Sequence, residues 1–296
     1  MAMVHIAPTV AAMTRTPIPE SGSDRASAAV FGRILCAVDG TRSAAEAARQ
    51  ATLLAGPNGA LTFIAVTHHA GVGATAMADL SPAHASQALV AAVQAAEMAG
   101  VRATTTLAEG RNTGDLILHA ARDHDLLILG APPHGRAAGI ALGSTASAAV
   151  HRSPVPVMLA RPPGQNEFPK RIVVASDGSP ESTSVVDIAA RIARRHQAKV
   201  TLVHTGRRET LDTTYRIAEE ATELYEQLRV EAIVVTDETP AHDTIVKAAD
   251  RETASLVITG SRGRTGLAAL GSVSERVAHA ASCSVLILRP RDRDAR

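Results

Sequence analysis

The sequence predicts an α/β protein made of two tandem copies of one domain, each a doubly wound parallel sheet with helices on both faces. Short aliphatic runs such as ILCAVD at 34–39 are continuously apolar, as expected of strands that are covered on both sides. These runs alternate with amphipathic stretches of helical length, an order that favours right-handed crossovers and a parallel sheet. The same order of runs then occurs a second time.

The internal repeat is carried by four blocks that keep their order along the chain. The pairs are RILCAVDGTRSA at 33–44 with RIVVASDGSPES at 171–182, LTFIAV at 61–66 with VTLVHT at 200–205, LLILGA at 126–131 with LVITGS at 256–261, and 141–161 with 269–289. Four collinear blocks do not arise from composition alone, so the chain is interpreted as two copies of one domain.

Each copy is predicted to run strand, helix, strand, helix, strand, helix, strand, helix, strand. In the first copy the elements are expected at 33–39, 42–55, 61–67, 81–99, 101–108, 113–123, 125–131, 143–152 and 155–160. In the second they are expected at 171–177, 180–196, 199–205, 209–229, 230–236, 241–252, 255–260, 271–281 and 284–289.

The domain boundaries follow from shifts in composition. We expect a flexible leader at 1–30, a first domain at 31–161, a Pro-rich linker at 162–170, a second domain at 171–290 and a charged tail at 291–296. A copy of this size has enough core to fold independently.

The composition excludes several classes of protein. Thirty basic against 29 acidic residues leave a formal charge of +1, which argues against a surface that neutralises nucleic-acid phosphates. Aromatic residues make up only 2%, too few for base stacking, and no apolar run approaches the roughly 20 residues of a membrane span. Cys36 and Cys283 lie in apolar runs and are too few for a disulfide framework, which fits the reducing cytoplasm.

The loop after the fourth strand of the second copy has the features of a phosphate site. It reads GSRGRTG at 260–266, and a helix opens shortly after it. Glycines let backbone amides approach an anion, a helix N-terminus adds about half a positive charge, and Arg262 and Arg264 would add full charges. The alternative is local: Ser272 and Glu275 form a capping box, and the glycines only permit a tight turn.

The corresponding loop of the first copy is a weaker version. It reads GAPPHGR at 130–136, and Pro132 and Pro133 remove two backbone donors where a phosphate would need them. It also carries one arginine, Arg136, where the second loop carries two. Any ATP is therefore expected mainly in the second copy.

An acid ends the first strand of each copy. Asp39 and Asp177 each precede a glycine and then a hydroxyl residue. A carboxylate in this place could accept hydrogen bonds from a ribose or from an adenine amine. It could equally be the N-cap of the helix that follows.

The sequence nominates no nucleophile with its base. The twelve histidines are scattered, and no H-E-x-x-H, C-x-x-C, G-x-S-x-G or G-x-x-x-x-G-K-[ST] motif occurs. The usual lysine and magnesium apparatus of phosphoryl transfer is therefore missing. An enzyme is the least favoured class.

At these residues the chain resembles the universal stress protein family in its tandem two-domain form. The resemblance lies in Asp177-Gly178-Ser179 and in the stretch 260–288, both echoed in the first copy, and it covers about 33–160 and 171–289. It implies flavodoxin-like, Rossmann-like domains with five parallel strands, which bind ATP in one subclass and not in another. It also implies that the two copies pair as a pseudo-dimer along their last strands, near 156–160 and 285–289.

The ATP-binding subclass has Gly, two residues, Gly, nine residues, Gly and then Ser or Thr. Here seven residues separate Gly263 from Gly271, and the first copy has four residues between Gly130 and Gly135. Both loops thus depart from the pattern, the first one twice. By resemblance, Asp177 and Asp39 lie at the adenosine end, and Thr205 and Val66 offer backbone groups to adenine. The cofactor-binding residues implied are Asp177, Thr205, Gly260, Ser261, Arg262, Gly263, Arg264, Gly271, Ser272, Val273 and Ser274 in the second copy, and Asp39, Val66, Gly130, Gly135, Gly143, Ser144 and Thr145 in the first.

The resemblance favours a cytoplasmic regulatory module in stress adaptation that binds an adenine nucleotide, with magnesium accompanying it. A homodimer is a further expectation, whereas nucleic acid, a membrane and a resident metal are not expected as partners. The second hypothesis is an interaction module of the same fold that has lost the nucleotide. The third is slow ATP hydrolysis.

Overall fold

The computed structural model describes residues 3–4, 29–67, 81–132, 142–177, 179–204, 234–235, 240–261 and 272–289. The first domain contains β2 (Arg33–Ala37), α2 (Arg42–Ala55), β3 (Ala60–Thr67), α3 (Pro82–Met98), β4 (Ala103–Glu109), α4 (Thr113–Ala121), β5 (Leu126–Gly130), α5 (Ser144–Arg152) and β6 (Val157–Ala160). The second contains β7 (Arg171–Ser176), α6 (Pro180–His196), β8 (Lys199–His204), β9 (Val234–Val235), α8 (Ala241–Arg251), β10 (Leu256–Gly260), α9 (Ser272–Ala280) and β11 (Ser284–Leu288). β1 (Met3–Val4) precedes both domains.

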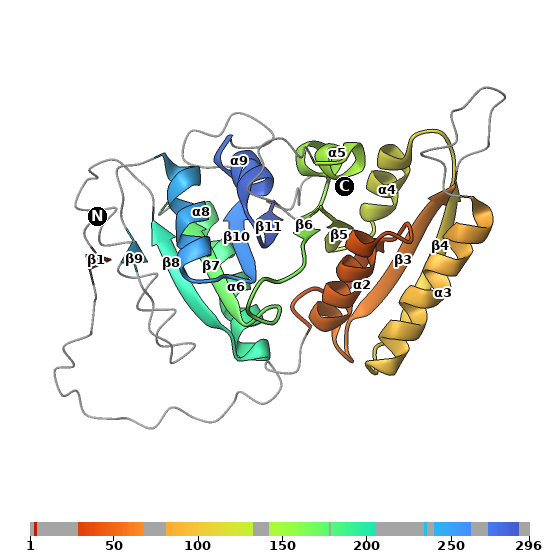
Figure 1. Ribbon diagram of the computed structural model, residues 1–296, viewed down its shortest axis with the longest axis horizontal. Coiled ribbons are helices and arrows are strands. Elements are labelled where there is room, and N and C mark those ends of the chain that lie inside the picture. The colour runs from red at the N-terminus through yellow and green to blue at the C-terminus, as the bar shows by residue number, and fades with distance from the viewer. Residues whose placement is uncertain are drawn as a thin grey trace.

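All strands of the described residues join one sheet in the order β1-β9-β8-β7-β10-β11-β6-β5-β2-β3-β4 (Figure 1). Within each domain the strands run parallel. The two domains meet where β11 pairs antiparallel with β6, with Val285 opposite Leu159 and Ile287 opposite Val157. The predicted doubly wound fold and the predicted pairing of the last strands are confirmed.

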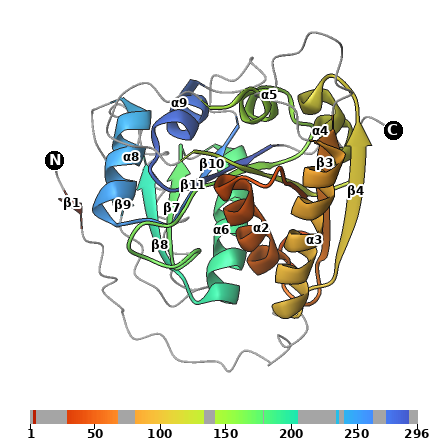
Figure 2. The same cartoon turned by 45° about the vertical axis from the view of Figure 1, so that its right-hand side comes forward.

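Two apolar cores lie on the two faces of this sheet. α2, α3 and α6 cover one face, and α4, α5, α8 and α9 cover the other (Figure 2). Successive residues of one strand point to opposite cores, so Ile34 and Cys36 belong to the first core and Leu35 to the second. Burial on both faces is the reason why these strands are continuously apolar.

The predicted elements agree closely with the structure where it describes them. The helices expected at 42–55 and 180–196 have those bounds, whereas β2 ends two residues before the strand expected at 33–39. The expected helix at 209–229 lies outside the described residues, as does most of the strand expected at 230–236. The charged tail at 291–296 lies outside them too.

The leader expected at 1–30 has only residues 3–4 and 29–30 within the described part of the chain. Its last residue, Val30, is buried with Phe31 in the first core, and Met3–Val4 forms β1 against β9. β9 would otherwise expose a row of unpaired N–H and C=O groups at the edge of the sheet. Two residues show no periodicity, so the sequence alone could not predict this strand.

Arg161 follows β6 and ties the two domains together. Its side chain is only 1% exposed, and it donates to the carbonyl oxygens of Cys283 (3.2 Å), Ala278 (2.6 Å) and Pro132 (3.3 Å). Burial lowers the pKa of the Arg161 guanidinium, and these carbonyl oxygens replace the water it has lost. The repeat places Arg289 at the equivalent position, and Arg289 donates to the carbonyl oxygen of Val150 in the first domain.

We expect Arg161→Met to lower the free energy of unfolding by about 3 kcal/mol, because three buried carbonyl oxygens lose their charged donor. Urea denaturation of the full chain measures the change. Arg122→Met is the control, since Arg122 is exposed at the end of α4 and takes part in no interdomain hydrogen bond of the described residues. Equal stability of the two variants would contradict the role given to Arg161.

Candidate functional site

A cavity of about 580 Å³ opens at the carboxyl edge of the first domain's strands. Its lining comes from the ends of β2, β3 and β5 and from the starts of α2, α4 and α5. The lining residues are Ala37, Val38, Asp39, Thr41, Ala44, Ile64, Val66, Arg111, Asn112, Thr113, Gly114, Ile117, Leu129, Gly130, Ser144, Thr145, Ala146 and Ala148. Five residues expected at a nucleotide site, Asp39, Val66, Gly130, Ser144 and Thr145, therefore line one cavity.

Three helices begin at this cavity. Thr41 caps α2 by accepting from Ala44 N, and Asn112 caps α4 by accepting from Asp115 N. α5 begins at Ser144, and its N-cap residue Gly143 has no side chain to bond the first amides. Helix N-termini carry partial positive charge and orphan N–H donors, so the cavity favours an anion.

Asp39 holds the turn before α2 rather than capping the helix itself. Its Oδ1 accepts from Thr41 N (2.9 Å) and Thr41 Oγ1 (2.6 Å). In the second domain Asp177 Oδ1 accepts from Ser179 N (3.0 Å), and Ser179 caps α6. The aspartates are therefore not the N-caps. The N-caps are Thr41 and Ser179, each two positions further along the chain.

The segment before α4 also contributes to the cavity, although the prediction from the sequence did not include it. Arg111, Asn112, Thr113 and Gly114 line the cavity because β4 ends at the same edge of the sheet as β2, β3 and β5. The signal was present in the spacing of Asn112 and Asp115, which is that of an N-cap. Arg111 is an exposed cation of the lining.

In the second domain the structure describes some of the expected site residues and brings Ser274 and Gly260 together. Ser274 Oγ donates to the carbonyl oxygen of Gly260 (2.5 Å), and Val273 packs on the second core. Gly260 and the buried Ser261 line a different cavity, between the two domains. Thr205, Arg262, Gly263, Arg264 and Gly271 lie outside the described residues, as does Gly135 of the first domain.

The start of α9 leaves the capping-box alternative undecided. Ser272 opens the helix, but its side chain is outside the described part of the chain. Glu275 Oε1 lies 3.4 Å from Nε2 of His151 on α5 of the other domain. Glu275 therefore contacts the neighbouring domain across the internal two-fold axis.

Side chains with strongly shifted pKa values lie elsewhere in the molecule. Burial raises the pKa of the Cys36 thiol far above its usual range and that of Cys283 to about 12. Burial, with the charges of Arg195 and Lys170, lowers the pKa of His196 to about 4. None of these three residues lines the first-domain cavity.

The described residues offer neither a metal site nor a membrane-spanning helix. They contain no group of three or more His, Cys, Asp or Glu side chains that could hold a metal ion. Their helices include none with the length and hydropathy that crossing a bilayer requires.

Gly130 shapes the cavity by letting α2 approach the end of β5. A Cβ atom at this position would lie 2.5 Å from Ser43 C and 2.7 Å from Ala44 N, both backbone atoms. We expect Gly130→Ala to lower the free energy of unfolding by about 2 kcal/mol, as overpacking does. Gly143→Ala is the matched control, because a Cβ there meets nothing within 4 Å. Thermal or urea unfolding compares the two, and equal losses would contradict this account of the cavity wall.

Comparisons with known proteins agree with this architecture. The model of the universal stress protein family matches residues 31–161 and 169–289. Universal stress protein YxiE of Bacillus subtilis is 31% identical over 146 residues, which are 40% of this chain and 98% of that protein. Universal stress protein Rv2005c of Mycobacterium tuberculosis is 29% identical over 196 residues, which are 58% of this chain and 64% of that protein. A universal stress protein crystal structure from Archaeoglobus fulgidus shares the fold, with a TM-score of 0.69 and 19% identity, covering 88% of this chain and 98% of that one. The chain therefore belongs to the universal stress protein family, of which it contains two tandem domains.

Proposed function

We propose that the protein binds an adenine nucleotide at the carboxyl edges of its sheet and acts as a regulatory module in stress adaptation. The observation that carries this proposal is the first-domain cavity, which gathers Asp39, Val66, Gly130, Ser144 and Thr145. Its volume of about 580 Å³ is in the range of cofactor sites. We expect the protein to work in the cytoplasm and through binding rather than catalysis.

The chemistry of the cavity suits the parts of a nucleotide. The N-termini of α4 and α5 would face the phosphates, and Arg111 would add a full charge. Asp39 binds Thr41 through Oδ1, so a ribose hydroxyl would donate to Oδ2. The aliphatic side chains of Ile64 and Val66 would pack on the adenine.

The second domain remains the stronger site in this proposal. Its loop contains Arg262, Gly263 and Arg264, whereas the first loop has Pro132 and Pro133 in the place of backbone donors. Pro132 also offers its carbonyl oxygen to Arg161 Nε, so this end of the first loop is tied to the domain junction. The first cavity would then bind the nucleotide more weakly.

The alternative is an interaction module that binds no nucleotide. The shortened glycine loops of both copies favour it, because they depart from the spacing of the ATP-binding subclass. Nucleotide titration separates the two functions. Slow hydrolysis is a separate question, answered by following ADP release from ATP with added magnesium.

Titration calorimetry of the full chain with magnesium and ATP tests the proposal and the asymmetry. We expect Gly263→Val to weaken ATP binding roughly tenfold, because a β-branched side chain blocks the close approach of a phosphate to the backbone. Gly135→Val in the first copy is the matched control and should leave most of the binding intact. The opposite result would place the main site in the first domain. No ATP binding by the unaltered chain would overturn the proposal in favour of the interaction module.

A further inference from the structure

The internal two-fold axis relates two junctions between the domains, and these junctions differ in their residues. The repeat aligns Gln50 with Ile188, Ser284 with Pro156 and Arg161 with Arg289. We call the place of Gln50, Ser284 and Arg161 the sealed junction, and the place of Ile188, Pro156 and Arg289 the open junction.

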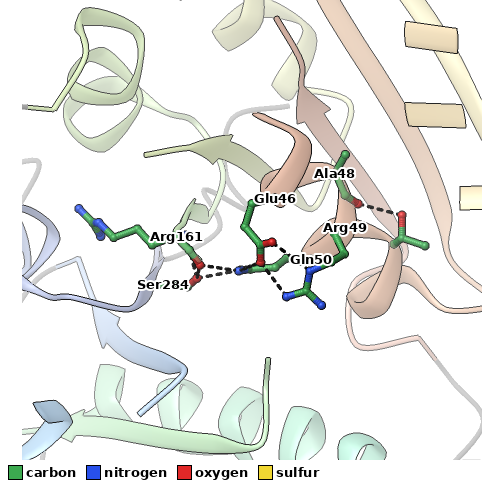
Figure 3. Close-up of polar contacts among 7 residues, drawn as sticks. Glu46, Ala48, Arg49, Gln50, Arg161 and Ser284 are labelled. Atoms are coloured by element: carbon green, nitrogen blue, oxygen red, sulfur yellow. Dashed lines mark hydrogen bonds and ion pairs between the residues drawn. The ribbon is translucent and has the colours of Figure 1, made fainter. Parts of the chain in front are cut away.

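The sealed junction is closed by buried hydrogen bonds (Figure 3). Gln50 Nε2 donates to the carbonyl oxygen of Arg161 (2.8 Å), and Ser284 Oγ donates to Gln50 Oε1 (2.8 Å). Gln50 Nε2 also contacts Glu46 Oε1 (2.7 Å), which in turn accepts from Arg49. Gln50 and Ser284 have no exposed surface, so no room is left for a ligand.

The open junction cannot form this network, because Ile188 and Pro156 have no side-chain donor or acceptor. A cavity of about 820 Å³ lies there instead. Its wall comes from both domains: the segment 29–32, Asp125 and Pro156 of the first, and the exposed face of α6 with the ends of β10 and β11 of the second. The replacement of a polar triad by Ile, Pro and Arg thus explains why one junction is hollow.

The charged lining residues of the open junction include two arginines. Asp125 is paired with Arg33, whose backbone N donates to its Oδ2 (2.9 Å) and whose Nη2 lies 3.7 Å from its Oδ1. Of the other charged lining residues, Arg191 and Arg289 outnumber Asp187. Arg191 Nη2 donates to the carbonyl oxygen of Ala29 (3.2 Å), which holds the guanidinium against the first domain.

The remaining wall is apolar. Phe31 and Leu288 are buried core residues that reach the cavity, and Ile188 and Pro156 complete this side. A cavity with an apolar wall and arginines in its lining matches an organic anion with an apolar body. The lining lacks Asp177, Val273 and Ser274, so it is not the second-domain counterpart of the nucleotide cavity, although it shares Gly260 and Ser261 with the expected phosphate loop.

We propose that the open junction is a second ligand site, which binds a small organic anion with an apolar body between the two domains. Arg191 binds the anionic group, and Phe31, Ile188 and Leu288 contact the apolar part. Because both domains supply its walls, such a ligand would stabilise their contact. The proposal does not depend on nucleotide binding.

The test uses anilinonaphthalene sulfonate, an aromatic sulfonate whose fluorescence rises on binding, as the probe. We expect the folded full chain to bind it with a stoichiometry of one, and Arg191→Ala to weaken binding roughly tenfold through loss of one charge-assisted contact. Arg194→Ala is the matched control, since Arg194 is an exposed arginine of α6 outside the cavity lining. Excess ATP should leave the probe bound.

A second variant closes the cavity by copying the sealed junction. Ile188→Gln with Pro156→Ser should abolish probe binding while the circular dichroism spectrum stays unchanged. If this variant does not fold, the comparison of Arg191→Ala with Arg194→Ala decides. The proposal is overturned if the unaltered chain does not bind the probe, if the two arginine variants bind it equally, if the closed variant still binds it, or if ATP displaces it.

Discussion

The antiparallel pairing of β6 with β11 is the constraint on which the rest of the structure depends. Each of these strands would be an exposed apolar edge in an isolated domain, and an exposed edge invites aggregation. Their pairing removes both edges, makes one continuous sheet of the two domains and creates the internal two-fold axis. It also brings the arginine that follows each strand, Arg161 or Arg289, against carbonyl oxygens of the opposite domain.

The same pairing separates the candidate sites. Because β6 and β11 run in opposite directions, the carboxyl edges of the two domains lie on opposite edges of the sheet. Two nucleotide sites built on those edges cannot form one composite site. Each domain junction, by contrast, combines the carboxyl edge of one domain with the amino edge of the other. The two junctions differ at a few side chains: Gln50 of one junction occupies the position that Ile188 has in the other.

The sequence predicts the fold well because the signals of the fold are local and repeated. Continuous aliphatic runs follow from burial on both faces, as Ile34 and Leu35 show, and collinear repeats indicate two domains.

The site is predicted only in part. Asp39, Val66, Gly130, Ser144 and Thr145 line one cavity as expected, but Arg111 and Asn112 join it through the end of β4. Arg161 was missed because an arginine after a strand resembles an ordinary surface charge, and only the paired domain buries it. The open junction depends on the register between the copies, which no single motif reveals.

Native-state hydrogen exchange of the β6 and β11 amides tests the central claim most directly. β6 lies between β5 and β11, and β11 lies between β10 and β6, so both strands are internal to the sheet. If the two domains form one sheet, the amides of 157–159 and 285–287 exchange only through global unfolding, with its full free energy. Exchange of these amides at the faster rate of the edge strand β4, through separation of the domains, would contradict the account.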